Sequence, residues 1–118
     1  MQKRRGNCNW ACAWYFRSMI VIVFRSRLKA GAAEAGYPEM AAEMFARAQT
    51  MPGFVAFKTF QAPDGERLSL VHWRDAETLA AWRNEERHRE AQRKGREEWY
   101  ESYSIEVAEV TRSSVFQA

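Results

Sequence analysis

The chain has 118 residues and a formal net charge of +3, and 47% of its residues are hydrophobic. This composition fits a single folded domain and excludes a disordered chain, and no apolar run reaches the roughly 18 residues that span a membrane. The basic excess is local, because residues 1–18 contain four of the 18 basic residues and no acidic one. The other 14 basic residues oppose 15 acidic ones, which weakens any argument for nucleic-acid binding from charge.

The first 18 residues differ from the rest of the chain. Cys8 and Cys12 both lie there, and a CxxxC pair without a nearby histidine is a poor metal site. The segment resembles a secretory signal only faintly, since no clear cleavage site precedes Arg17. We predict that residues 1–18 are a non-native or flexible extension, with Met19 as the natural start; a genuine tail or a weak targeting segment are the alternatives. Residues 19–118 lack cysteine, which predicts a cytoplasmic protein.

Apolar periodicity predicts the elements of the remaining domain. Residues 20–27 are rich in β-branched residues, as in a buried strand. Apolar residues recur at i, i+3, i+4 and i+7 from residue 37 onward, as in an amphipathic helix. The predicted elements are a strand over 20–27, a helix over 37–51, strands over 54–62 and 66–73, helical stretches over 76–84 and 85–100, and a strand over 103–110.

This order of strand, helix, strand, strand, helix, strand predicts an α+β domain of ferredoxin-like βαββαβ topology. Such a domain has a four-stranded antiparallel sheet with two helices on one face. The other face should then be polar if water covers it. It is not, because the first two strands alternate apolar residues on both faces. The first strand supplies Ile20, Ile22 and Phe24 to one face and Val21 and Val23 to the other. The second strand supplies Phe54, Ala56 and Phe60 to one face and Val55 and Phe57 to the other.

The two-sided apolar strands indicate a partner for the sheet. A bare apolar face of several hundred Å² is uncommon in a soluble monomer. A second copy, related by two-fold symmetry and packed sheet to sheet, would cover that face. We therefore predict a homodimer through the sheet face.

The candidate site lies in residues 68–88, where a strand leads into a helix. Trp73 ends the strand and could stack on a flat ligand or belong to the core. Trp82 lies on the apolar face of the helix, where a core role is favoured. His88 is either a surface histidine or an acid–base group. His72 shares a sheet face with the leucines at 68 and 70, as a hydrogen-bonded residue at the dimer face or as a pocket residue.

Other site types find little support. The basic residues of 83–98 alternate with glutamates, which is typical of a solvated, ion-paired helix face rather than an RNA-binding one, and the strands lack an aromatic RNP motif. Glycine-rich phosphate loops, zinc-binding helices and serine-nucleophile motifs are absent from the sequence. We predict no cofactor, no metal, no nucleic-acid partner and no membrane partner.

Four segments of residues 19–112 together resemble the antibiotic biosynthesis monooxygenase family. These are the opening IVIVFRSRLKAG, the junction MPGFVAFKTFQ, the segment HWRDAETLAAWRNEERH and a closing strand after the second helix. The resemblance implies a dimeric α/β barrel built from ferredoxin-like subunits. It also implies, for family oxygenases, O₂ chemistry on an aromatic or quinone-type substrate without metal or flavin.

The resemblance also implies which residues form the site. Trp73 and His88 match a recurring pocket tryptophan and helix histidine, which gives them catalytic roles; Trp73 would also bind substrate. We predict further substrate contacts from Trp82, His72, Arg25, Tyr100 and Tyr103. The alternative hypothesis is a ligand-binding or structural dimer of the same fold that has lost the chemistry.

The haem-degrading branch of that family is a separate possibility. It uses an asparagine in the first strand, a tryptophan at the end of the third and an axial histidine on the second helix. Trp73 is kept, but Ser26 and Gln92 occupy the other two positions. We therefore reject haem degradation, unless a shift of register lets His88 replace Gln92.

Overall fold

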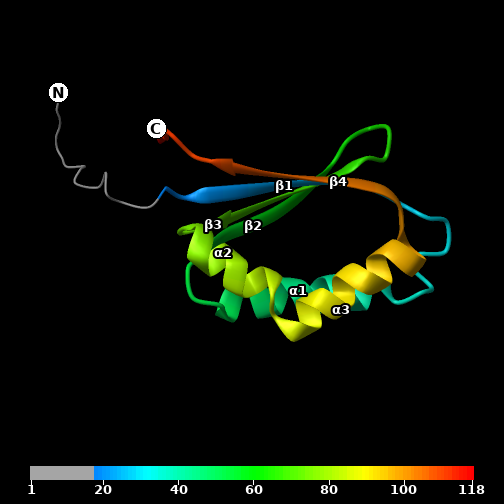
Figure 1. Ribbon diagram of the computed structural model, residues 1–118. Helices are drawn as coiled ribbons and strands as arrows, with labels where there is room; N and C mark the ends of the chain where they lie inside the picture. The colour runs from blue at the N-terminus through cyan, green and yellow to red at the C-terminus, as the bar shows by residue number, and fades with distance from the viewer. Residues whose placement is uncertain (1–17) are drawn as a thin grey trace, which may run out of the picture.

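The computed structural model describes residues 18–118, in which helices pack on one face of an antiparallel sheet (Figure 1). The strands are β1 (Ile20–Leu28), β2 (Phe54–Gln61), β3 (Arg67–Trp73) and β4 (Tyr100–Glu109), arranged β2-β3-β1-β4. The helices are α1 (Tyr37–Thr50), α2 (Ala76–Arg83) and α3 (Glu86–Lys94), followed by a π-helical turn, η1 (Gly95–Trp99). The predictions made for the cysteine pair and the rest of residues 1–17 lie outside the described residues.

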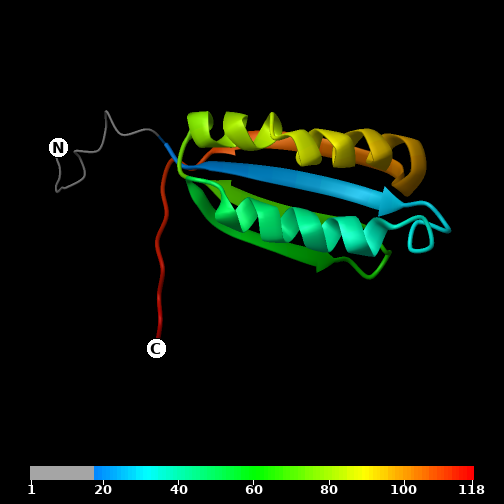
Figure 2. The same ribbon diagram turned by 90° about the horizontal axis from the view of Figure 1, so that it is seen from below.

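The predicted ferredoxin-like α+β fold is confirmed. All three strand pairs are antiparallel, and β1 lies between β3 and β4. Seen from the helix side, α1 runs alongside β2 and the α2–α3 segment runs alongside β4 (Figure 2). Strand β4 begins at Tyr100, three residues before the predicted start. Among the described residues, no helix is long and apolar enough to cross a membrane.

The second helix is two helices separated by a short break. Asp75 caps α2, because its carboxylate accepts the Thr78 N–H at 2.9 Å while the Thr78 side chain faces the Asp75 N–H. These hydrogen bonds, first among them the one from the Thr78 backbone, lower the pKa of Asp75 to about 2. After the break at Asn84 and Glu85, the Glu85 carboxylate caps α3 by accepting the His88 N–H at 2.9 Å. The predicted division of this stretch near residue 84 is thus confirmed.

One face assignment in the second strand is wrong. A bulge between Phe54 and Ala56 shifts the register of β2 against β3, so Phe54 pairs with Trp73 and Phe57 pairs with Val71. Both phenylalanines pack against the core under the helices. Strict alternation cannot anticipate a bulge, because the extra residue changes the face of every position on one side of it.

The core lies between the sheet and the helices. Its buried members come from β1, β3 and the helices α1, α2 and α3: Ile20, Met44, Ala48, Val71, Trp73, Leu79, Trp82 and Ala91. The largest fully buried side chain among the described residues is Trp73. Fully burying a side chain of this kind stabilises the fold by roughly 2–3 kcal/mol, so the end of β3 is a fixed point of the domain.

Candidate functional site

Three stacked aromatic rings connect the end of β3 with α2 and α3. The rings of Trp73 and Trp82 stack with their centroids 5.9 Å apart, and those of Trp82 and His88 stack at 4.2 Å. The structure therefore brings these three predicted site residues together. Trp82 lies between the other two, so Trp73 and His88 are the ends of one stack.

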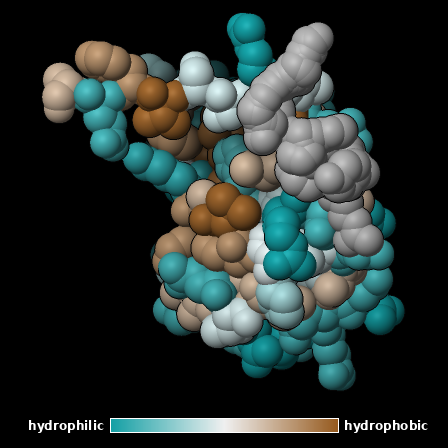
Figure 3. Space-filling model, turned by 90° about the vertical axis from the view of Figure 1, so that its left-hand side faces the viewer, coloured by the Kyte–Doolittle hydropathy of each residue, from teal (hydrophilic) through white to brown (hydrophobic). Residues whose placement is uncertain are grey.

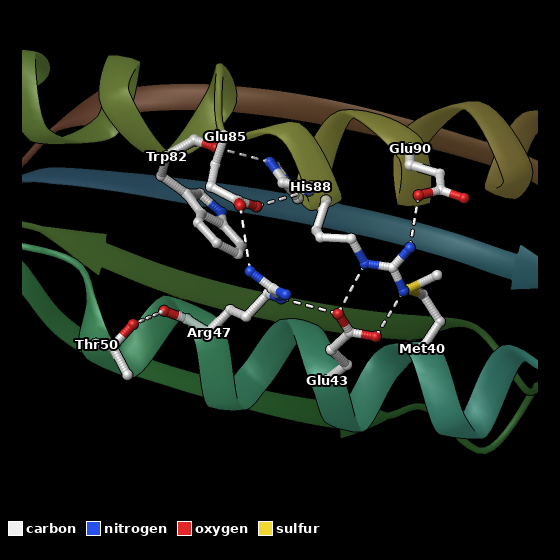
Figure 4. Close-up of polar contacts among 9 residues, drawn as sticks. Met40, Glu43, Arg47, Thr50, Trp82, Glu85, His88 and Glu90 are labelled. Carbon is white, nitrogen blue, oxygen red and sulfur yellow. Dashed lines mark hydrogen bonds and ion pairs between the residues drawn. The ribbon is translucent and has the colours of Figure 1, made fainter.

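His88 is held as a single neutral tautomer. Its Nδ1 lies 3.1 Å from the carbonyl oxygen of Trp82 (Figure 4). Because a carbonyl can only accept, Nδ1 carries the proton and Nε2 keeps its lone pair. Burial lowers the pKa of His88 below its ordinary value of 6.5, which favours the neutral ring at pH 7. The ring is thus prepared to accept a proton at Nε2.

The indole nitrogen of Trp73 is the unusual polar atom of the stack. It is buried and has no hydrogen-bond partner among residues 18–118. Buried indole N–H groups usually find an acceptor, since an unsatisfied buried donor costs about 1–3 kcal/mol. An orphaned donor at this position could be satisfied by an oxygen atom of a bound molecule.

A chain of ion pairs joins α1 to the helix that carries His88 (Figure 4). Arg87 donates from Nε and Nη2 to the two carboxylate oxygens of Glu43, at 2.8 and 2.7 Å, and from Nη1 to Glu90. Arg47 binds Glu43 at 2.8 Å and Glu85 at 3.3 Å. Hydrogen bonds from Arg87 and then from Arg47 lower the pKa of Glu43 to about 2. The chain ends at Glu85, the cap of α3, and so it helps to fix where α3 begins.

An apolar row on β4 lies open on the helix side of the sheet. Its members, Tyr103, Ile105 and Val107, pair with β1 residues that face the helices. Ile105 and Val107 nevertheless remain 51% and 54% exposed. The helices therefore leave apolar sheet surface uncovered along the edge strand, where a flat apolar molecule could lie. We call this row of three residues the β4 row.

Tyr100 and Tyr103 lie on the same face of the sheet as Trp73, at its other end. Both rings pack around Phe24, with centroids 5.4 and 5.5 Å away. Tyr103 pairs with Ser26, which is six residues along β1 from the partner of Trp73, or about 20 Å. Burial raises the pKa of Tyr100 above its ordinary value of 10, and so this phenol stays protonated.

His72 and Arg25 lie on the opposite face of the sheet. They occupy strand positions that alternate with the core residues Val71 and Trp73 in β3 and with Phe24 and Ser26 in β1. The Arg25 guanidinium binds the Glu66 carboxylate through two hydrogen bonds of 2.9 and 3.0 Å. Arg25 also lines a cavity of about 220 Å³, which Tyr103 reaches from β4. The structure does not bring His72 or Arg25 to the Trp73–Trp82–His88 stack.

Comparison with known proteins connects this geometry to a family. The profile of the antibiotic biosynthesis monooxygenase family matches residues 19–94, about two thirds of the chain. The chain belongs to this family. It is also 36% identical to the uncharacterized protein YqjZ of Bacillus subtilis over 84 residues, which cover 71% of this chain and 74% of that protein.

A second relative in sequence and two solved structures are also similar to the chain. The chain is 32% identical over 98 residues to the jasmonate monooxygenase ABM of Pyricularia oryzae; the match covers 80% of this chain but only 45% of that protein. SnoaB of Streptomyces nogalater, a cofactor-independent oxygenase, superposes with a TM-score of 0.69 at 15% identity, covering 85% of this chain and 99% of SnoaB. SO0527 of Shewanella oneidensis gives a TM-score of 0.70 at 16% identity, with 80% and 92% covered. At these identities the structural matches establish the fold alone.

The family domain contains site features that the sequence patterns did not reveal. The Trp82 carbonyl, the Glu85 cap and the Glu43–Arg87 pair all influence His88 or its helix. Glu85 and His88 are three residues apart, as a helix cap and its partner are, and this spacing was the one available signal. The exposure of the β4 row could not be read from sequence, because an alternating edge strand has the same pattern whether or not a helix covers it.

Proposed function

We propose that this family member is a cofactor-independent monooxygenase acting on a small aromatic or quinone-type substrate. The observation that carries the proposal is the neutral His88, whose Nδ1 is committed to the Trp82 carbonyl and whose Nε2 can accept a proton. The substrate would lie between the sheet and the helices, against Ile105 and Val107 of the β4 row. One of its oxygen atoms would accept the orphaned N–H of Trp73.

The proposed reaction uses the substrate itself as the electron donor. His88 removes the proton of a phenolic hydroxyl, and the resulting phenolate transfers an electron to O₂. Recombination forms a carbon–oxygen bond at the ring, and loss of water leaves a quinone. One O₂ thus converts a phenol into a quinone and one water molecule. The protein supplies the base, the orientation of the ring and an apolar environment.

The proposed catalytic residues all belong to the stack of Trp73, Trp82 and His88. Trp73 and His88 keep the roles predicted for them, with Trp82 as the ring that joins them. Tyr100 and Tyr103 could contact only a long substrate, because they lie about 20 Å along the strand. His72 and Arg25 are not included, since they lie on the other sheet face.

The same subunit is proposed to act as a homodimer in the cytosol. The dimer proposal rests on apolar side chains of the face turned away from the helices, which include Val21, Val23, Leu68 and Leu70. Two such sheets packed face to face would form the dimeric α/β barrel. The cytosolic location rests on the absence of cysteine from residues 19–118.

Oxygen uptake with a panel of polycyclic phenols and hydroquinones tests the proposed activity. His88→Asn is the sharpest variant, because an asparagine amide can still donate to the Trp82 carbonyl but cannot act as a base. We expect it to lower kcat/KM about 100-fold or more, and ¹⁸O₂ should place one labelled oxygen in the wild-type product. His72→Asn provides the matched histidine control on the other face.

The outcomes separate the candidate functions. Wild-type rates in His88→Asn would exclude His88 as the base, and equal losses in the two histidine variants would point to a general structural effect. Binding of panel compounds to the wild type without oxygen consumption would support the ligand-binding alternative. Trp73→Phe, which deletes only the N–H and the fused ring, should raise KM for substrates that carry an acceptor oxygen.

A further inference from the structure

The C-terminal segment, residues 111–118, forms an extended arm that leaves the domain. The arm begins where the Val110 N–H donates to the Met19 carbonyl at 2.9 Å, which fixes its origin beside the start of β1. From there it runs away from β4, past the ends of the other strands and beyond β2 (Figure 2). Figure 1 shows it on the side of the sheet opposite to the helices.

The arm carries a pair of large apolar residues that its own domain leaves exposed. Val115 and Phe116 are 84% and 88% exposed, far more than any other large apolar residue among those described. They stand within a polar segment, since serines precede them and Gln117 follows. Figure 3 looks onto the end of the molecule from which the arm leaves, and shows apolar residues on the projecting segment as well as on the body. An apolar pair on a polar arm indicates a contact with another surface.

The length of the arm makes a second copy the natural partner. Eight extended residues reach about 26 Å, whereas four strands span only about 14 Å between their outer axes. The arm therefore extends past its own sheet, on the side where the second sheet of the proposed dimer would lie. In a two-fold dimer each subunit would extend one arm over the other, so the contact is made twice.

We propose that residues 111–118 form a dimer-locking arm, in which Val115 and Phe116 dock on the second copy of the chain. The inference rests on the proposed sheet-to-sheet dimer and adds to it an exchange of arms. Each docked arm buries two apolar side chains that are exposed in the single chain, which favours the associated state. The exchange would tighten the dimer more than tenfold without altering the residues near His88.

Photo-crosslinking from the arm tests where it docks. The full-length chain is prepared with p-benzoylphenylalanine in place of Phe116 and irradiated at micromolar concentration. We expect a covalent species of twice the chain mass, with mass spectrometry locating the link on the other copy in a mixture of ¹⁵N-labelled and unlabelled chains. Links found only within one chain would overturn the proposal in favour of an arm that folds back on its own sheet.

Sedimentation equilibrium tests what the arm contributes. The double variant Val115→Asp/Phe116→Asp should raise the dimer Kd at least tenfold relative to Ser114→Asp/Gln117→Asp, which adds the same charge beside the apolar pair. Equal Kd values would overturn the arm contact while leaving the dimer itself intact. If the wild type is a monomer at micromolar concentration, the proposed dimer and the proposed arm contact are both wrong. Oxygen uptake, measured in parallel, reports on the catalytic proposal independently of either result.

Discussion

At the scale of single residues, His88 shows how the fold changes the chemistry of a common side chain. On a charged helix a histidine would ordinarily be solvated, with its proton equilibrium near 6.5. Here the ring is stacked on Trp82 and bonded to a backbone carbonyl. The carbonyl fixes the tautomer, while burial of the ring lowers its pKa, and so the ring is a base rather than an acid at neutral pH.

The lowered pKa of His88 predicts a pH dependence of stability. Between the pKa in the folded state and 6.5, the unfolded chain binds a proton that the folded chain does not. His88 therefore leaves the free energy of unfolding unchanged above pH 7 and lowers it as the pH falls below 6.5. Urea unfolding of the wild type and His88→Asn from pH 8 to pH 5 should show a smaller loss in the variant. Parallel curves for the two proteins would contradict the pKa assignment.

Asp75 and Glu43 contribute in a different pH window. Their folded-state pKa values of about 2 lie below the ordinary carboxyl range. The stability that they supply is present above about pH 4 and is lost as the pH falls toward 2. The effect of His88 is therefore separable from theirs, because the scan from pH 8 to pH 5 ends before these carboxylates begin to protonate.

Gly53 is a second residue whose role depends on its surroundings. Its φ of 85° favours glycine, and a Cβ there would collide with the Thr78 side chain of the α2 capping box. Gly53→Ala should lower the free energy of unfolding by roughly 2–3 kcal/mol, the sum of backbone strain and collision.

Gly65 provides the matched control for that substitution. Its φ is 94°, but nothing lies within 4 Å of a Cβ at this position. Gly65→Ala should therefore show the strain alone, about 1 kcal/mol. Chemical denaturation of both variants measures the difference, and equal losses would show that Thr78 moves aside without cost.

At the scale of elements, an ion-pair bridge connects α1 with α3. The bidentate contact between Arg87 and Glu43 joins the two helices through residues that are 44 positions apart in sequence. The bridge lies at the surface, so its value is mainly geometric, because exposed ion pairs add little stability. It holds α3 against α1 close to where the Glu85 cap positions His88.

Replacing Arg87 should change the pKa of Glu43, its ion-pair partner. In Arg87→Gln the carboxylate of Glu43 loses the larger of its two stabilising partners, and its pKa should rise from about 2 toward the ordinary value near 4.3. Carboxyl ¹³C chemical shifts measured against pH will report this change. Arg93→Gln, which removes only the Arg93–Glu97 pair on the same helical segment, should leave the titration of Glu43 unchanged.

At the scale of the whole molecule, the uncovered sheet face predicts association. Leu70 lies on that face, so Leu70→Asp would place a charge at the proposed interface between two sheets. We expect a dimer for the wild type in sedimentation velocity at micromolar concentration and a monomer for this variant. Ala46→Asp, on the exposed side of α1, supplies the same charge away from the interface and should remain dimeric. A dimer in both variants would place the interface elsewhere.

Much of the fold could be predicted because its local signals agree with one another. The i, i+3, i+4 pattern of α1, the turn at Pro63-Asp64-Gly65 and the Asp75–Thr78 capping box each specify one short structure. Their order along the chain leaves the ferredoxin-like arrangement as the natural solution. The bulge at Phe54 and Ala56 was missed, since it depends on how β2 meets β3 and not on the residues of β2 alone.

The candidate site was only partly readable in the same way. Sequence by itself determined that Trp73, Trp82 and His88 follow one another from a strand into helices, because periodicity and capping are local properties. Only the tertiary structure decided that their rings form one stack, that a carbonyl fixes the tautomer of His88, and that His72 and Arg25 lie on the other face. Those facts depend on the angles at which β3, α2 and α3 follow one another and on which face of the sheet the helices cover, and packing of the whole domain sets both.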